Sequence, residues 1–264
     1  MHTIAATANT PAAALRTLLC HLLRHGSGSK MKGGKLMGQI TSVGKIQTAS
    51  RPQTSLARLT ACEVALVYAG ILAYIWRWQY TFPHVWMALY AVILASHFFH
   101  RDTLRGLGLT LTELRASAGL ALPVAILFCL PMLLYGFARH SLMLVQPSWQ
   151  SLIPLLGYGS WCTFQQYLTQ SYFHNRLMLI IRNRHVRSVL IGIMFGATHI
   201  PNPILTVVTA IAGFIFAEIF ARHRNIWPLA LAQAVGGLLL ATVAPDALIH
   251  HMRVGPGYFF YGIR

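Results

Sequence analysis

The sequence predicts an all-α, polytopic membrane protein: a bundle of about seven transmembrane helices. Of its 264 residues, 55% are hydrophobic and only 10% are charged, and the mean hydropathy is +0.54. An ordinary soluble domain carries about a quarter charged residues. This composition, the succession of long apolar stretches and the one-sided distribution of basic residues together exclude a soluble globular fold.

Apolar stretches follow one another along most of the chain, separated by short polar or basic turns. A helix needs about 20 mainly apolar residues to cross a bilayer alone. The fifth stretch is shorter, which suggests that neighbouring helices shield its ends. The expected spans are Leu59–Trp76, Val85–Phe99, Ala116–Phe137, Leu152–Ile181, Val189–Ile200, Ile204–Ala221 and Ile226–Val243.

The arginines and lysines favour one orientation of these spans. A cytoplasmic amino terminus places the basic residues before the first span, and those of three later loops, on the cytoplasmic side. The basic residues that remain outside are Arg77, Arg139, Arg253 and Arg264. The positive-inside rule therefore predicts an inner or plasma membrane protein with its amino terminus in the cytoplasm and its carboxyl terminus outside.

The formal net charge of +16 predicts contact with anionic membrane lipids. We expect no nucleic-acid partner, because no basic segment carries the interleaved aromatic residues of such an interface. Residues 1–58 are expected to form a basic, flexible cytoplasmic tail. A transit peptide, or an interfacial helix around Ala12–Arg24, is an alternative for this segment. Residues 59–245 form the predicted bundle, and residues 246–264 form an extramembrane carboxyl-terminal tail.

Polar residues stand at similar depth in three of the predicted spans. Helical rise places His199 about 18 Å from Arg187, and the other members at comparable depth, near the middle of the bilayer. Polar groups there are costly and usually functional, which favours a shared pocket. Two alternatives remain open: His199 as a core histidine, and the glutamines as interhelical hydrogen-bonding residues. The group consists of Gln165, Gln166, Gln170, His199 and Gln233.

The same residues resemble a known family in their order and spacing. The segments 164–170 (FQQYLTQ), 195–199 (FGATH) and 232–237 (AQAVGG) are similar to three ordered motifs of the CAAX protease and bacteriocin-processing (CPBP) membrane endopeptidases. Those motifs read Glu-Glu-x-x-x-Arg, Phe-x-x-x-His and His-x-x-x-Asn. The resemblance covers about residues 100–245.

The resemblance implies hydrolysis of a peptide bond near a hydrophobic or lipidated terminus. A glutamate of the first motif and the histidine of the second would activate water, and the third motif would stabilise the oxyanion. In this chain Phe195 and His199 match the motifs. In the first motif, Gln165 and Gln166 replace the two glutamates and Gln170 replaces the arginine. In the third motif, Gln233 replaces the histidine and Gly237 replaces the asparagine.

These replacements remove most of the proton-transfer chemistry. A carboxamide is no general base, although Gln233 could still donate a hydrogen bond to an oxyanion. His199 is then the remaining candidate base. Glu218 could supply a carboxylate, but its spacing from Arg222 favours an i, i+4 ion pair at a helix end. The other acidic residues are expected to be peripheral: Glu63, Asp102, Glu113 and Asp246.

Neither a metal site nor a cofactor is predicted, because His199 lacks histidine or carboxylate neighbours at ligand spacing. The cysteines form no Cys-x-x-Cys pair and are expected to be packing residues. Two functions therefore remain: a CPBP-type endopeptidase with an altered active site, acting on a membrane-associated or lipidated substrate, and a non-catalytic relative. The second would bind a peptide, a lipid or a membrane partner in the same pocket.

Overall fold

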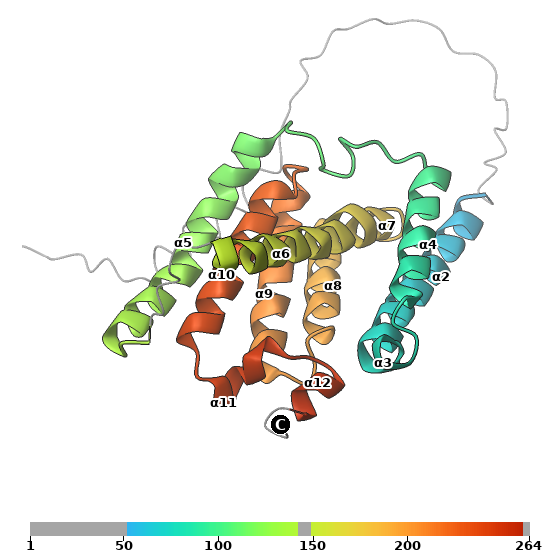
Figure 1. The fold of residues 1–264 in the computed structure, drawn as a ribbon. Helices are drawn as coiled ribbons and strands as arrows, with labels where there is room; N and C mark the ends of the chain where they lie inside the picture. Colours follow the sequence, from blue (N-terminus) through green and yellow to red (C-terminus); the bar gives the residue numbers. More distant parts are fainter. Residues whose placement is uncertain (1–51, 142–148, 261–264) are drawn as a thin grey trace, which may run out of the picture. The chain divides into compact units, whose positions relative to one another are not determined.

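The computed structural model describes residues 52–141 and 149–260, and every regular element in these ranges is helical (Figure 1). Each of the seven predicted apolar stretches coincides with helix, which confirms the all-α class for the described residues. Of the tail expected over residues 1–58, residues 1–51 lie outside the described ranges. The chain is helical from Pro52 onward, in the run α2 (Pro52–Ala73), η1 (Tyr74–Trp78) and α3 (Gln79–Thr81).

Asparagine caps fix the starts of the two helices that flank His199. The Asn183 side chain accepts hydrogen bonds from the backbone N–H groups of His185 and Val186, and Asn202 accepts one from Leu205. Such caps satisfy N–H groups that have no partner within the helix. Besides α2 and the run that begins at Trp149, the long helices are α4 (Val85–Phe99), α5 (Leu114–Ala138), α8 (Arg184–Ala197), α9 (Pro203–Phe220) and α10 (Trp227–Val243).

One continuous helical run carries the first predicted motif. It consists of α6 (Trp149–Gln166), the π-helical η2 (Tyr167–His174) and α7 (Asn175–Met178). In Figure 1 this run crosses α8, α9 and α10; α6 contacts α10, and η2 contacts α8 and α9. π-Helical turns are rare and frequently occur at functional sites. The change from α-helix to π-helix just after Gln166 therefore favours a functional site near this residue.

Helices α8 and α9 pack closely because α8 presents glycines to α9. A Cβ at Gly196 would lie 2.8 Å from the Thr206 carbonyl oxygen and 2.7 Å from the Ala210 Cβ. Gly192, one turn earlier, lies equally close to the backbone of Ala210. Small residues spaced four apart allow helices in membranes to approach backbone to backbone. This contact fixes the end of α8, where His199 follows.

Helix α9 also joins the two larger apolar clusters of the bundle. Its Ala217 packs with residues of α2, α4, η2, α7 and α8, while its Phe216 and Phe220 pack with residues of α5 and α10. Cys129 and Cys162 are buried free thiols, as expected of packing residues, whereas Cys62 is exposed. Cys20 lies outside the described residues.

The segment expected as a carboxyl-terminal tail is folded through residue 260. It forms α11 (Asp246–Ile249), η3 (His250–Met252) and α12 (Pro256–Phe259). The Asn202 side-chain amide donates to the Ile249 carbonyl over 2.7 Å, and the Gly255 N–H donates to the Ile200 carbonyl over 2.9 Å. The segment therefore contacts the loop that follows His199.

Three helical stretches of the described residues are long and apolar enough to cross a membrane: Ser55–Thr81, Leu114–Ala138 and Pro203–Arg222. Val85–Phe99 and Trp227–Val243 are shorter apolar helices. Large apolar side chains such as Phe98 (80% exposed) and Ile153 (74%) cover the outside of the bundle, as expected where lipid replaces water. The count of seven spans stays a prediction.

The α8–α9 contact can be tested with a single added methyl group. Gly196→Ala should destabilise the folded protein by about 1–3 kcal/mol, because the methyl group meets backbone atoms that cannot move aside. Gly119→Ala in α5 is the control, since nothing lies within 4 Å of its Cβ position. Thermal unfolding in detergent should show a lowered midpoint for Gly196→Ala alone; equal behaviour of both variants would contradict the close packing.

Candidate functional site

A cavity of about 790 Å³ lies among the described helices and gathers most of the predicted site residues. Gln165, Phe195, His199, Gln233 and Gly237 all line it. They come from α6, α8, the loop after α8, and α10. The rest of the lining is mainly apolar and aromatic, with contributions from α2, α4, α5 and α9. The structure thus brings residues 72 positions apart in the sequence, Gln165 and Gly237, to one chamber.

Gln166 and Gln170 do not line the cavity; both are completely buried beside it in the helix bundle. They connect to the cavity through a chain of side-chain amides. Gln170 Nε2 donates to Gln166 Oε1 over 3.3 Å, and Gln166 Nε2 donates to Gln233 Oε1 over 2.6 Å. Gln233 Nε2 then donates to Gln165 Oε1 over 2.5 Å. We call these four residues the glutamine relay; it ties the run α6–η2 to α10.

The imidazole of His199 is buried and held from one side. Its Nδ1 lies 2.8 Å from the Phe195 carbonyl oxygen, and the two rings meet edge to face with centroids 5.1 Å apart. The carbonyl oxygen can only accept, so Nδ1 carries the proton and Nε2 carries the lone pair. The Thr209 hydroxyl is 3.1 Å from the same Nδ1. Among the described residues, no hydrogen bond joins His199 to the glutamine relay.

Tyr158 explains why the chain has glycine at position 237. A Cβ at Gly237 would overlap the Tyr158 hydroxyl oxygen. The tyrosine side chain therefore occupies the space into which the asparagine of the motif would project. The replacement by Gly237 and the position of Tyr158 are two parts of one packing arrangement.

Among residues 52–141 and 149–260, no Asp, Glu, Lys or Arg side chain lines the cavity. Glu218, the alternative carboxylate, lies elsewhere: it pairs with His185 (2.9 Å), Arg184 (3.7 Å) and Arg222 (3.9 Å). Its expected helix-end ion pair is confirmed. Among residues 52–141 and 149–260, no group of three or more His, Cys, Asp or Glu side chains could hold a metal ion.

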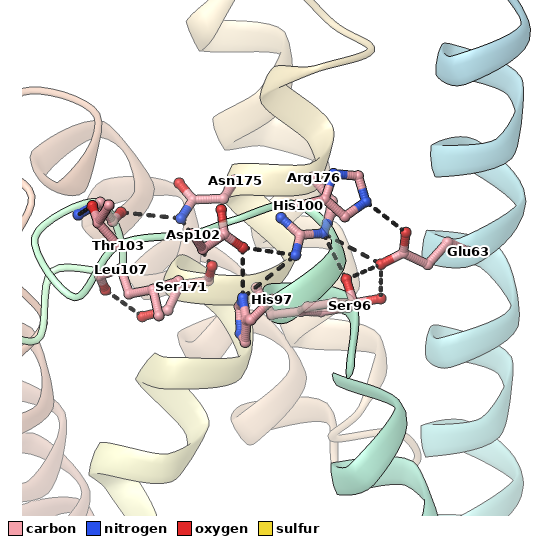
Figure 2. A network of polar contacts seen from close by, with 12 residues as sticks. Glu63, Ser96, His97, His100, Asp102, Thr103, Leu107, Ser171, Asn175 and Arg176 are labelled. Atoms are coloured by element: carbon pink, nitrogen blue, oxygen red, sulfur yellow. Dashed lines mark hydrogen bonds and ion pairs between the residues drawn. The ribbon is translucent and has the colours of Figure 1, made fainter. Parts of the chain in front are cut away.

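A second polar centre, which the sequence analysis missed, surrounds Arg176 of α7 (Figure 2). Arg176 is 1% exposed, and its Nη2 donates to Asp102 Oδ2 over 2.7 Å. Its Nε lies 3.3 Å from Glu63 Oε1 and donates to Ser96 Oγ over 2.9 Å. One guanidinium group therefore joins α2, α4 and the loop after α4 to the run that carries the glutamine relay.

Further hydrogen bonds complete this Arg176 network. The Tyr172 hydroxyl donates to Glu63 Oε1 over 2.9 Å, and His97 Nδ1 lies 2.7 Å from Asp102 Oδ2. Burial raises the pKa of the Asp102 carboxyl, but hydrogen bonds from Arg176 and His97 outweigh burial and hold that pKa below its ordinary value. The carboxylate is therefore ionised at neutral pH, as the ion pair requires.

Glu63 and Asp102 do not line the cavity, in line with the expectation that they are peripheral to the site, but both contact the buried Arg176, which the sequence analysis missed. The sequence did contain a signal. Arg176 is a lone arginine inside the predicted fourth span, and Glu63 is a lone carboxylate inside the first. Charges of opposite sign within two predicted spans favour a buried pair between them.

Residues 162–239 match the family model of the type II CAAX prenyl endopeptidases described as Rce1-like. All three motif segments lie inside this match, so the resemblance seen in the sequence is confirmed over that part of the chain. No curated protein and no solved structure shows a significant match.

The pairing of Tyr158 with Gly237 predicts a compensating double change. Gly237→Ala alone should lower the free energy of unfolding by about 1–3 kcal/mol, because the new methyl group collides with the tyrosine hydroxyl. Tyr158→Phe removes that oxygen and should restore part of the loss in the double variant. Thermal unfolding of the four proteins of this cycle measures the coupling; additive effects would contradict the arrangement.

Removing the Arg176 guanidinium should strongly destabilise the bundle. Arg176→Met leaves Glu63 and Asp102 without their shared cation, and breaking such a buried pair costs about 3–5 kcal/mol. Arg139→Met, at the exposed end of α5, is the matched control and should change stability by less than about 0.5 kcal/mol. Unfolding in detergent, followed by intrinsic fluorescence, measures the stability of both variants. Comparable losses of stability would contradict the structural role of the Arg176 ion pairs.

Proposed function

We propose, from the Rce1-like family match over residues 162–239 and the cavity built by the same segment, that this chain binds an apolar, membrane-associated peptide without efficient hydrolysis. Family membership supports a peptide or protein ligand in general. The three candidate spans and the family match indicate a multi-pass membrane protein. We further propose the orientation that the basic residues favour, with a cytoplasmic amino terminus in an inner or plasma membrane.

The observation that carries the proposal is the electrical neutrality of the cavity. Activation of water for peptide hydrolysis needs a base, and a carboxylate that stabilises the protonated base assists it. Glutamines stand at the positions of both motif glutamates, Gln165 at the cavity wall and Gln166 buried beside it, and an amide takes up no proton near neutral pH. No salt bridge to His199 occurs among the described residues, so an imidazolium formed there would lack a carboxylate partner.

The lining of the cavity favours an apolar ligand. Aromatic and aliphatic side chains from several helices form most of its wall, including Tyr90, Trp161, Phe164 and Phe195. Burying apolar surface in such a chamber is favourable by about 25 cal/mol per Å². A hydrophobic or lipidated peptide segment, already concentrated in the membrane, satisfies this requirement, and membrane lipids would contact the exposed apolar outside of the bundle.

Slow peptide hydrolysis is a second candidate function, favoured by the tautomer of His199. The hydrogen bond from Nδ1 to the Phe195 carbonyl leaves the Nε2 lone pair available. A neutral imidazole with an open lone pair can accept a proton from water. Without a carboxylate partner, we expect this reaction to be slower than in an intact site by at least about 100-fold.

The two functions are distinguished by turnover of a membrane-embedded reporter peptide library in proteoliposomes. We expect the wild-type protein to bind peptides but to release no more product than His199→Ala, because no carboxylate assists the imidazole. Gln165→Glu restores a carboxylate at the first motif and should raise cleavage above the wild-type level. Cleavage by the wild type that His199→Ala abolishes would instead support the second candidate. If none of the peptides binds the wild-type protein, the proposal is overturned.

A further inference from the structure

The hydrogen-bonding groups that the cavity leaves open indicate what chemical group its ligand presents. Most hydroxyl groups at its wall are committed within the protein, because their hydrogens are donated to backbone carbonyl oxygens. These hydroxyls belong to Tyr68, Thr169, Thr198 and Thr209. Gln79, Tyr90 and Tyr158 also line the cavity, but the open groups that belong to the motif segments are those of the glutamine relay and of His199.

The relay has a direction. Each amide nitrogen donates to the next amide oxygen, from the buried Gln170 toward Gln165 at the cavity wall. At the buried end, Gln170 Oε1 has no hydrogen-bond partner. Turning all four amides around would instead leave the Gln170 NH₂ group buried with unpaired hydrogens, and unpaired donors are rarer in proteins than under-satisfied carbonyl oxygens. The observed direction is therefore the favoured one.

This direction places a donor at the cavity. Gln165 accepts from Gln233 through its oxygen, while its Nε2 donates to no described residue and is not sealed by packing. His199 supplies the complementary group. Its Nδ1 is held by Phe195, and its Nε2 lone pair is likewise without a partner among the described residues and not sealed from the cavity. The cavity lining thus offers an N–H donor from Gln165 and an acceptor from His199.

We propose that the cavity recognises a backbone amide of an apolar peptide segment and holds it intact, with its carbonyl oxygen accepting from Gln165 Nε2 and its N–H donating to His199 Nε2. This inference rests on the proposed function and names the group that the bound peptide must present. A backbone amide carries one strong donor and one strong acceptor, which match in kind the open acceptor of His199 and the open donor of Gln165.

Charged ends of a peptide do not fit the same chamber. A free carboxylate has no N–H to give to the His199 lone pair, and no Lys or Arg of the described residues lines the cavity to neutralise it. A free ammonium group likewise finds no carboxylate there. Burying an unpaired charge in an apolar site is costly, so the chamber selects an internal segment or a capped terminus over a free one.

The inference is tested by changing the ligand and leaving the protein intact. The probes are apolar peptides capped at both ends, in which one backbone amide at a time is replaced by an ester. An ester lacks the N–H, so it cannot donate to His199. At one position of the peptide, the ester should weaken binding to the wild-type protein in lipid nanodiscs by about 2- to 10-fold, the equivalent of one hydrogen bond.

A protein variant tests whether His199 accepts the hydrogen bond from the peptide N–H. His199→Phe keeps a ring beside Phe195 but lacks the nitrogen acceptor, so the amide and ester forms should bind it equally. His84→Phe, an exposed histidine before α4, should retain the wild-type preference. Gln165→Glu keeps an acceptor for Gln233 but loses the donor to the cavity, and should weaken binding of every capped amide peptide.

The outcomes separate this inference from the proposed function. Binding of capped peptides without any position-specific preference for amide over ester overturns the inference and leaves the proposed function standing. A preference that persists in His199→Phe also overturns it. Equal binding of peptides that end in a free carboxylate within the cavity contradicts the selection against charge. Absence of binding by all apolar peptides overturns the proposed function itself.

Discussion

The ion pairs of the buried Arg176 with Glu63 and Asp102 are the interaction on which the arrangement of the described helices depends (Figure 2). A guanidinium group that is 1% exposed is tolerated only when carboxylates and hydrogen-bond acceptors surround it. Its partners come from α2 and from the loop after α4, whereas Arg176 ends the run that carries the glutamine relay. Satisfying this one charge therefore aligns helices that are far apart in the sequence.

Charged and neutral polar side chains lie in different parts of the described bundle: the Arg176 network holds charged ones, and neutral ones line the cavity. Charged groups satisfy one another around Arg176, whereas the polar side chains that the described part of the chain contributes to the cavity include no Asp, Glu, Lys or Arg. In the CPBP motifs, by contrast, the glutamates belong to the reaction site. Here carboxylates serve packing and alignment, and the site that corresponds to the motifs has hydrogen-bonding groups suited to holding a ligand.

Hydrogen-bond direction links the buried side of the site to the chamber. The glutamine relay starts at Gln170, which is buried and does not line the cavity, and ends at Gln165 on the cavity wall. A change at the buried end can therefore alter which group faces a ligand. His199 is set in a comparable way, because the Phe195 carbonyl fixes its tautomer from the side away from the open nitrogen.

The sequence alone predicts much of the helical architecture and most of the polar residues that meet at the cavity. Apolar runs of helical length determine where helices occur, because an isolated apolar segment in a membrane must satisfy its backbone groups internally. The motif spacings identify Gln165, His199 and Gln233, and the family match covers all three. The depth argument also predicts a shared pocket, since residues at equal depth in adjacent helices can meet.

Only the tertiary structure decides which partners those residues have. The sequence cannot show that Tyr158 fills the space beside Gly237, or that amides line up from Gln170 to Gln165, because both depend on how helices turn toward one another. It also did not reveal that Glu63 and Asp102 pair with Arg176, since this partner is more than 70 residues away along the chain. Long-range pairing of charges is set by packing, which local sequence pattern does not encode.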